Sequence, residues 1–191
     1  AVESILVTGG ETQGSIVKIL AMAKEQGIPV KETSPAKLDN MCGHQNHQGV
    51  IAVTGAANYS TMEDIYKKAG GQPLFVIIAD EITDPHNLGA IIRTAEIAGA
   101  HGVIIPKRGS VGLTVTVAKT SAGAVEHLPV VRVSNLAATV DQLKKDGVWV
   151  YGTDMEGQCW CEIDYTGPVA LIVGSEGKGM SRLLTDKCDF I

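Results

Sequence analysis

Aromatic residues, basic charge and long apolar runs are all scarce in this chain of 191 residues. Only 4% of the residues are aromatic, so aliphatic side chains must build most of the core that a 45% hydrophobic composition allows. The 16 Lys and Arg against 21 Asp and Glu give a net charge of −5, which argues against indiscriminate nucleic-acid binding. A local basic patch is still compatible with that charge. Without a signal peptide or an apolar run near the ~20 residues that span a bilayer, we expect a cytoplasmic protein with no membrane partner.

Metal-binding spacings are also absent from the sequence. The four cysteines are Cys42, Cys159, Cys161 and Cys188. No CxxC pair occurs, and Cys159-Trp-Cys161 has the wrong spacing for a common zinc knuckle, so we expect free thiols and no metal. His44 and His47 are an i, i+3 pair in a polar loop, where RNA contact and plain surface hydrogen bonding both stay open.

Two successive patterns of strands and helices divide the chain. The first, residues 1–57, is expected to hold strands at Val2–Thr8, Ile28–Val30 and Val50–Thr54, a helix capped by Ser15 and ended by Gly27, and a helix opened by Ser34-Pro-Ala. Residues 58–73 are expected to be a linker that carries one helix, capped by Thr61 or Ser60 and running through Lys68. This gives a small α/β domain ahead of a larger one at 74–191.

The larger domain alternates apolar strands with helices, and it contains no internal repeat or low-complexity segment. Expected strands are Leu74–Ala79, Val103–Pro106, Leu128–Val133, Val148–Thr153 and Val169–Val173. Expected helices are Leu88–Ala98, Leu113–Ala122, Leu136–Lys145 and Met180–Lys187. Continuous apolar strands between helices predict a parallel sheet covered on both faces, hence an α/β fold.

Two loops of this domain follow buried strands and lead into helices. They are Asp80–Arg93 and Leu171–Gly179. Because ligands bind at the carboxyl ends of parallel strands, both loops can meet at one site. In the first loop we expect Asn87 to be the helix N-cap, and Arg93, in a largely apolar helix, either to reach solvent, to meet an anion, or to pair with an acidic residue of the loop (Asp80, Glu81 or Asp84).

The glycines of the second loop fit neither common nucleotide-binding motif. Gly174, Gly177 and Gly179 are spaced in the reverse order of the G-x-G-x-x-G fingerprint, and Gly179 is not followed by the Lys-Ser/Thr of a Walker A loop. What remains is a glycine-rich strand-to-helix turn, which either lets a ligand approach the backbone closely or has no ligand at all.

The two loops together resemble a known family. NLGAIIRTAEIAGA (87–100) and VGSEGKGMSRLL (173–184) resemble motifs 1 and 2 of the SpoU, or TrmH-like, RNA 2′-O-ribose methyltransferases of the SPOUT superfamily. The resemblance covers about Leu74 to Ile191. More weakly, HQGVIAVTG (47–55) resembles the end of the L30e-like substrate-binding domain of the branch that methylates a guanosine ribose in bacterial 23S rRNA.

The resemblance implies a fold, a cofactor and site residues. It implies an α/β-knot domain with a deep trefoil knot, preceded by an L30e-like RNA-binding domain, and a homodimer. S-adenosylmethionine would bind along Thr153, Val173, Gly174, Glu176 and Gly179. Asn87 and Arg93 would be the catalytic residues of motif 1, and Glu176 the acid of motif 2. Ser175 departs from the asparagine that many members have there. The family's third motif should begin after Ile191, and we expect the chain to be incomplete at both ends.

The chemistry of a ribose 2′-hydroxyl restricts these roles. Methyl transfer needs the hydroxyl aligned with the sulfonium carbon and relieved of its proton. Arginine, with a pKa above about 12, is a poor base, so we favour Arg93 as a bidentate anchor for the adjacent phosphate and Glu176 as an orienting group. Lys107, Arg108, Lys119 and Arg132 are candidates for a basic strip along the RNA, or else scattered solvated charges; of these, Lys107 and Arg108 are the residues expected to bind RNA beside Arg93.

Other functions stay open at this point. The resemblance favours methylation of rRNA, and a tRNA methyltransferase of the same family is the alternative within enzymes. A non-catalytic RNA-binding or ribosome-assembly protein, and an ordinary nucleotide-binding α/β protein, are the alternatives from other classes. Intact Asn87, Arg93 and Glu176 argue against a non-catalytic protein.

Overall fold

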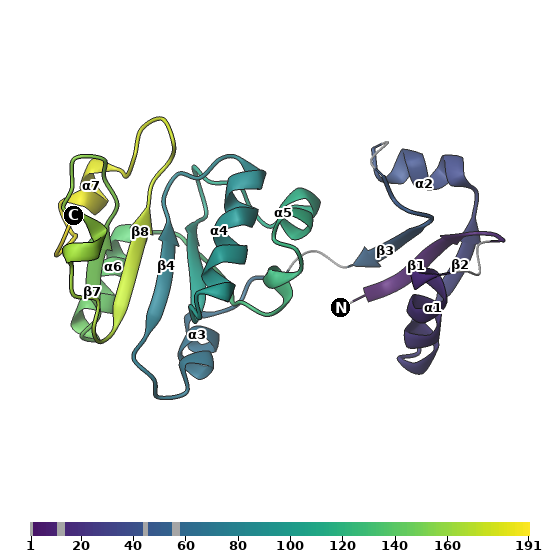
Figure 1. The fold of residues 1–191 in the computed structure, drawn as a ribbon, viewed down its shortest axis with the longest axis horizontal. Coiled ribbons are helices and arrows are strands. Elements are labelled where there is room, and N and C mark those ends of the chain that lie inside the picture. The colour runs from purple at the N-terminus through teal and green to yellow at the C-terminus, as the bar shows by residue number, and fades with distance from the viewer. Residues whose placement is uncertain (1, 11–13, 44–45, 55–57) are drawn as a thin grey trace. The chain divides into compact units, whose positions relative to one another are not determined.

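Two compact units make up the protein. The computed structural model describes residues 2–10, 14–43, 46–54 and 58–191, and the units are Ala1–Asn58 and Tyr59–Ile191. Figure 1 traces each of them as a ribbon coloured along the chain. The domain boundary expected at residue 57 and His44 both lie outside the described residues.

The first unit is a three-stranded sheet with two helices. In chain order its elements are β1 (Val2–Thr8), α1 (Ser15–Glu25), β2 (Val30–Thr33), α2 (Pro35–Met41) and β3 (Val50–Thr54), which confirms the expected order. β1 lies between β2, to which it is parallel, and β3, to which it is antiparallel. Ile5, Val7 and Ala23 form its small core. The second strand begins two residues later than predicted, and Ser15 is the first helical residue after a Gly14 N-cap.

The second unit is built on a five-stranded sheet in which every pairing is parallel. Its strands are β4 (Phe75–Ala79), β5 (Gly102–Pro106), β6 (Val130–Val133), β7 (Trp149–Gly152) and β8 (Val169–Val173). They lie in the order β6-β5-β4-β8-β7, with β4 at the centre. This confirms the predicted α/β fold with a mostly parallel sheet; the trefoil knot stays a prediction.

Helices cover both faces of this sheet, as continuous apolar strands require. On one face lie α3 (Met62–Ala69), α6 (Leu136–Lys145) and α7 (Arg182–Thr185), and on the other α4 (Pro85–Ile97) and α5 (Val115–Thr120) (Figure 1). Successive residues of β4 alternate between the two cores: Val76 and Ile78 pack with the first group of helices, and Ile77 and Ala79 with the second.

Residues 58–73 do not form the linker that the sequence indicated. Thr61 and Asp64 form a capping box at the start of α3, and Ile65, on the same helix, is completely buried in the core of the second unit. The helix was predicted correctly, but its glycine-rich end, Gly70-Gly71, is a turn within the unit and not a domain boundary. Local composition cannot distinguish these two cases, because only packing decides them.

Candidate functional site

The two loops singled out in the sequence leave neighbouring strands at the same edge of the sheet. Ala79 at the end of β4 pairs with Val173 at the end of β8, and Gly152 of β7 pairs with Ile172 of β8. Thr153 continues from β7, where its amide and its hydroxyl both donate to the carbonyl of Ile172, at 3.1 Å each. The prediction that the two loops meet is therefore confirmed, and Thr153 lies beside Val173 and the second loop.

Asp80 links the two loops directly. It is the first residue after β4, and only 5% of its surface is exposed. Its amide donates to the Val173 carbonyl at 2.9 Å, and its Oδ2 accepts from the Ser181 amide at 2.7 Å. The start of one loop is thus bonded to both ends of the other, since Val173 precedes the glycine turn and Ser181 follows it. From the sequence, Asp80 was expected only as a possible partner of Arg93; its position directly after an apolar strand was the available signal.

The glycine turn closes on itself through a pair of backbone hydrogen bonds. The Ser175 amide donates to the Gly179 carbonyl at 3.0 Å, and the Gly179 amide donates to the Ser175 carbonyl at 2.8 Å. A Cβ on Gly174 would lie 2.1 Å from the Gly179 carbonyl carbon, so only glycine fits there, while Gly177 has open space around it. Within the described part of the chain, the amides of Glu176 and Gly177 donate to no other group. The turn therefore presents free backbone donors to any ligand that approaches it.

Asn87 and Arg93 both lie inside α4, which begins earlier than predicted. Asp84 and not Asn87 is the N-cap: its carboxylate accepts from the His86 amide at 2.7 Å, and Pro85 occupies the first helical turn. Asn87 is half-buried in the first turn, and Arg93 is exposed further along the helix. None of the ion pairs among the described residues includes Arg93, so the structure does not contain the pairing with Asp80, Glu81 or Asp84 that was one of three alternatives for this residue. Its guanidinium is therefore available to an anion.

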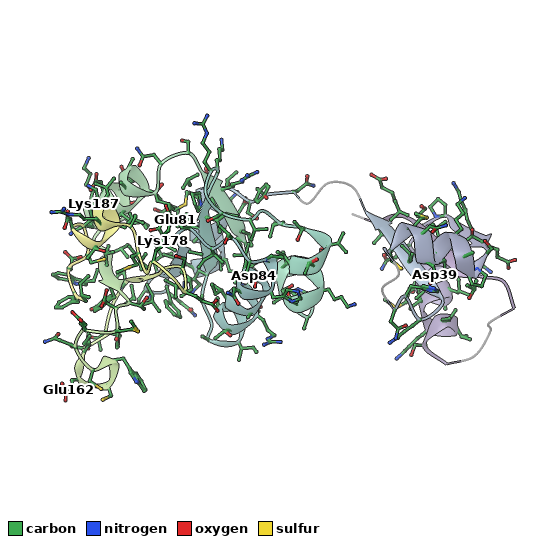
Figure 2. The ribbon with its side chains drawn as sticks, turned by 90° about the horizontal axis from the view of Figure 1, so that it is seen from above. Asp39, Glu81, Asp84, Glu162, Lys178 and Lys187 are labelled. Atoms are coloured by element: carbon green, nitrogen blue, oxygen red, sulfur yellow. The ribbon has the colours of Figure 1, made fainter. Side chains whose placement is uncertain are left out.

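The loop between β4 and α4 has an unusual backbone. Glu81 has a φ of 53°, in the left-handed region that non-glycine residues rarely adopt. The carbonyl of the next residue, Ile82, accepts from the Val111 amide at 2.8 Å, which ties this loop to the one after β5. Figure 2 labels Glu81 and Asp84 on the first of these loops and Lys178 on the glycine turn. Glu176 is exposed on that turn and shares no hydrogen bond with Asn87 or Arg93 in the described structure.

The basic residues expected to bind RNA divide between two places. Lys107 and Arg108 are exposed directly after β5, at the same edge of the sheet as the two loops. Arg132 of β6 donates from a terminal guanidinium nitrogen to the Lys107 carbonyl at 2.9 Å, and its guanidinium lies 5.3 Å from the centre of the Tyr59 ring. Lys119 is exposed on α5, on the face that carries α4. The structure thus brings Lys107 and Arg132 together and places Lys119 elsewhere.

Metal and thiol chemistry find no additional support in the described residues. No cluster of three or more His, Cys, Asp or Glu side chains in residues 2–10, 14–43, 46–54 and 58–191 is placed to hold a metal ion. None of the four cysteines forms a disulfide in the part of the chain that the structure describes. His47 forms local bonds instead: its Nδ1 accepts from the Gly49 amide at 3.0 Å, and its Nε2 lies 3.2 Å from Asp39. In the same described ranges, none of the helices has the length and apolar character needed to span a membrane.

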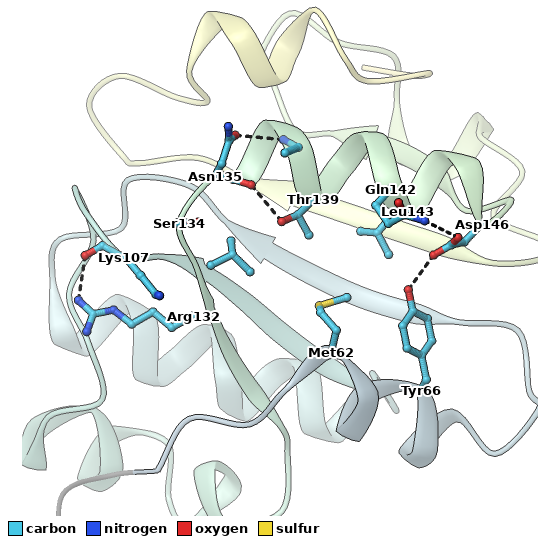
Figure 3. Close-up of a pocket in the computed structure, with 12 residues that line it drawn as sticks. Met62, Tyr66, Lys107, Arg132, Ser134, Asn135, Thr139, Gln142, Leu143 and Asp146 are labelled. Atoms are coloured by element: carbon cyan, nitrogen blue, oxygen red, sulfur yellow. Dashed lines mark hydrogen bonds between the residues drawn. The ribbon is translucent and has the colours of Figure 1, made fainter.

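A cavity of about 630 Å³ opens on the face of the second unit's sheet that carries α3 and α6, opposite to α4. It lies between α3 and α6, beyond the ends of β5 and β6, as Figure 3 shows. A second cavity of about 330 Å³ is lined by Phe75, Tyr165, Gly167, Val169 and Leu171, near the start of β4 and β8. Neither of these two includes a residue of the glycine turn. Of the residues that line the larger cavity, only Lys107 and Arg132 were candidates from the sequence, which contains no signal for the other walls.

Comparison with protein-family models assigns both units. Residues 74–191 match the model "SpoU rRNA Methylase family", and residues 1–60 match "RNA 2′-O ribose methyltransferase substrate binding". The two matches cover most of the chain and leave residues 61–73 between them, and the first match ends close to the division of the structure after Asn58.

Known proteins agree with this assignment. The chain is 50% identical over 183 residues to a putative TrmH family tRNA/rRNA methyltransferase, YacO, of Bacillus subtilis, covering 94% of this chain and 73% of that protein. It is 45% identical to a putative TrmH family tRNA/rRNA methyltransferase of Staphylococcus aureus, covering 99% of this chain and 77% of that one.

Solved structures share the fold. An S-adenosylmethionine-bound rRNA methyltransferase from Sinorhizobium meliloti has a TM-score of 0.79 at 25% identity, covering 98% of this chain and 68% of that one. The AviRb methyltransferase from Streptomyces viridochromogenes, with S-adenosylmethionine, has a TM-score of 0.75 at 24% identity, covering 100% and 72%. The chain belongs to the SpoU rRNA methylase family, and it is an RNA methyltransferase that uses S-adenosylmethionine.

Proposed function

We propose that this protein transfers the methyl group of S-adenosylmethionine to a ribose 2′-hydroxyl, and that its substrate is a guanosine of 23S rRNA. The observation that carries the proposal is the linkage of the two motifs at one edge of the sheet. Asp80 bonds the start of the first motif loop to Ser181, at the end of the second, so a ligand on the glycine turn lies beside the loop that leads to α4.

The cofactor would be held mainly by backbone groups. The unbonded amides of Glu176 and Gly177 are donors suited to a carboxylate or a ring nitrogen. Thr153, Val173, Gly174 and Gly179 would complete this site. When bound, S-adenosylmethionine supplies an electrophilic methyl group on a sulfonium.

Arg93 would act on the phosphate next to the target ribose. It is exposed, free of ion pairs among the described residues and permanently charged, so a bidentate contact with a phosphate is its most favourable role. That contact would position the 2′-hydroxyl and stabilise the negative charge that develops on its oxygen. The phosphate itself or a water molecule would accept the proton, since a guanidinium is a poor base.

Asn87 and Glu176 would complete the catalytic group. Asn87 lies near the start of α4, and Glu176 on the glycine turn, so the two come from the two linked loops. We propose that Glu176 orients Asn87 or Arg93 once substrate and cofactor are bound. Lys107 and Arg108 would contact the RNA backbone beyond the reacting ribose.

The choice of rRNA depends on the first unit. A match to a substrate-binding model over residues 1–60, together with the L30e-like resemblance, favours the rRNA branch. The two relatives named above carry tRNA and rRNA together in their names, so tRNA is the second candidate. We further propose that the protein acts in the cytoplasm as a homodimer, in which both subunits contribute to each active site.

One experiment tests substrate and reaction together. The protein is incubated with labelled S-adenosylmethionine and either unmodified rRNA or unmodified tRNA, and the RNA is digested to nucleosides for mass spectrometry. We expect 2′-O-methylguanosine from rRNA alone. A signal from tRNA alone would make tRNA the substrate in place of rRNA. Base methylation in place of ribose methylation would contradict the proposal.

A further inference from the structure

We propose that the cavity between α3 and α6 binds one nucleotide of the RNA strand that carries the target ribose. The inference rests on the proposed function, because it concerns the same substrate. It assigns a second contact on the opposite face of the sheet from α4, and the shape and chemistry of the cavity carry it.

One end of the cavity is basic. Lys107 and Arg132 lie side by side there, and neither belongs to an ion pair among the described residues (Figure 3). The Arg132 guanidinium is held in place by the Tyr59 ring and by its bond to the Lys107 carbonyl. Its Nε is buried and bonds to nothing in the described structure, an unusual condition for a charged donor. A phosphate at this end would satisfy donors that the protein leaves free.

The centre and the far end suit a base. Met62, Val133 and Leu143 give an apolar wall, and the Tyr66 ring lies beyond them. Single-stranded bases bind by stacking on aromatic and apolar side chains, so this wall fits one unpaired base of any type. The volume of about 630 Å³ is large enough for a nucleotide with its sugar.

The acidic residue of the cavity does not oppose a phosphate at the basic end. Asp146 is the only carboxylate among the described lining residues, and it lies at the far end with two donors of its own. Its Oδ2 accepts from the Tyr66 hydroxyl at 2.9 Å, and its Oδ1 accepts from Gln142 at 2.8 Å. Burial, together with the hydrogen bond to Asp146, raises the pKa of Tyr66 to about 12. The side-chain oxygen of Gln142 and the Ser134 hydroxyl form no hydrogen bond in the described structure and can meet the edge of a base.

Lys107 connects the cavity with the proposed active site. It follows β5 at the edge of the sheet where the two motif loops lie, and it also lines the cavity on the α6 face. An RNA strand that crosses this edge can therefore place one ribose near α4 and a neighbouring nucleotide between α3 and α6. Such a contact would hold the strand in register without contributing to methyl transfer itself.

The test compares two variants with a matched control. Lys107→Glu replaces one of the two cations at the basic end by an anion, and Ala138→Trp fills the cavity from an exposed position on α6. Lys145→Glu makes the same charge change at an exposed position of α6 outside the cavity. The affinity of each protein for a short, mixed-sequence single-stranded RNA is measured by fluorescence anisotropy at several salt concentrations. S-adenosylmethionine affinity and the unfolding midpoint check that each variant is folded.

We expect Lys107→Glu and Ala138→Trp each to weaken RNA binding about tenfold or more, and Lys145→Glu by less than about twofold. Lys107→Glu should also lower the slope of log affinity against log salt by about 1. Equal affinities for Ala138→Trp and the unaltered protein would overturn the proposal while the methyltransferase activity stands. If the unaltered protein bound S-adenosylmethionine but no RNA at all, the proposed function would fail first.

A second arm separates an RNA strand from a free nucleotide. Adenosine 5′-monophosphate and guanosine 5′-monophosphate are titrated into the same four proteins and followed by calorimetry. If the mononucleotides bind weakly and Ala138→Trp abolishes both this binding and most of the RNA affinity, the result supports the cavity as a binding site for one nucleotide of the RNA strand. Loss of mononucleotide binding with unchanged RNA affinity would instead assign the cavity to a free nucleotide and overturn the RNA contact.

Discussion

Replacing Gly174 by alanine tests the cofactor site through its backbone alone. The added Cβ would lie 2.1 Å from the Gly179 carbonyl carbon and 2.2 Å from the Met180 amide nitrogen. Ordinary contact begins at 3.4 Å, so the returning backbone would have to move by about 1.3 Å. Backbone atoms cannot rotate away as a side chain can, and overpacking of this kind costs about 1–3 kcal/mol.

That free energy should appear in the affinity for S-adenosylmethionine. The cofactor is proposed to bind the turn in its present conformation. To bind the cofactor, the variant must therefore return its displaced backbone to that conformation, which costs the same free energy of about 1–3 kcal/mol. We therefore expect the dissociation constant of Gly174→Ala to rise by about 5-fold to 150-fold in a calorimetric titration. The far-ultraviolet circular dichroism spectrum should not change, because the sheet and the helices lie outside the turn.

Gly177→Ala is the matched control, because it makes the same substitution three residues away in the same turn. No atom lies within 4 Å of a Cβ at Gly177, and the residue is not in the left-handed region. We expect the affinity to change by less than about threefold. An unchanged affinity in Gly174→Ala would refute the argument that this turn binds the cofactor, and equal losses in both variants would refute the argument from its shape.

Three further predictions concern residues outside the turn. Arg93→Ala should lower the rate of methyl transfer by about 10²–10³-fold with S-adenosylmethionine affinity nearly unchanged, and Arg93→Lys should recover part of the rate, as measured by single-turnover labelling of RNA; activity that survives in the alanine variant would remove Arg93 from the mechanism. Asp80→Ala should lower the free energy of unfolding by about 1–3 kcal/mol, since it leaves the Ser181 amide without its acceptor, whereas Asp80→Asn keeps an acceptor and should lose less in a urea titration; equal unfolding midpoints for the alanine variant and the unaltered protein would contradict the assigned bond. Burial, with the charge of Asp189 adding to it, raises the pKa of Cys188 to about 11, so only about one thiol in a thousand is ionised at pH 8, while the hydrogen bond from Cys161 lowers the pKa of Cys159. Iodoacetamide at pH 8 should therefore alkylate Cys159 first and Cys188 last, in an order that peptide mass spectrometry can follow, and prompt labelling of Cys188 in the folded protein would contradict its burial.

The sequence predicted the elements whose periodicity is strong and whose ends are marked locally. β8 and α6 have the bounds expected for them, Val169–Val173 and Leu136–Lys145, because an apolar run and an Asn135 cap define them without reference to the rest of the chain. The predicted start of α4 was wrong because Asp84, which is followed by a proline, caps the helix ahead of Asn87, the N-cap that we expected. The role of residues 58–73 was wrong because a helix in a linker and a helix on a sheet have the same local sequence.

The candidate site likewise contains residues that the sequence could predict and contacts that it could not. Residues that carry a motif, such as Asn87 and Arg93, are visible in the sequence, since their spacing is itself the signal. Contacts between segments distant in the chain are not visible: Asp80 and Ser181 are 101 residues apart, and only the parallel pairing of β4 with β8 brings them together. The walls of the α3–α6 cavity come from separate elements for the same reason, so no local pattern marks them.

The bond between Asp80 and Ser181 also bears on how two motifs serve one reaction. Methyl transfer requires the ribose and the sulfonium to be aligned closely, and a small displacement of either one costs rate. If the ribose is held from α4 and the cofactor from the glycine turn, their alignment depends on whatever fixes one loop against the other. Asp80 does this, because it begins the first loop and its buried carboxylate accepts from the Ser181 amide at the end of the second. Loosening it should therefore lower the rate of transfer more than it lowers the affinity for S-adenosylmethionine.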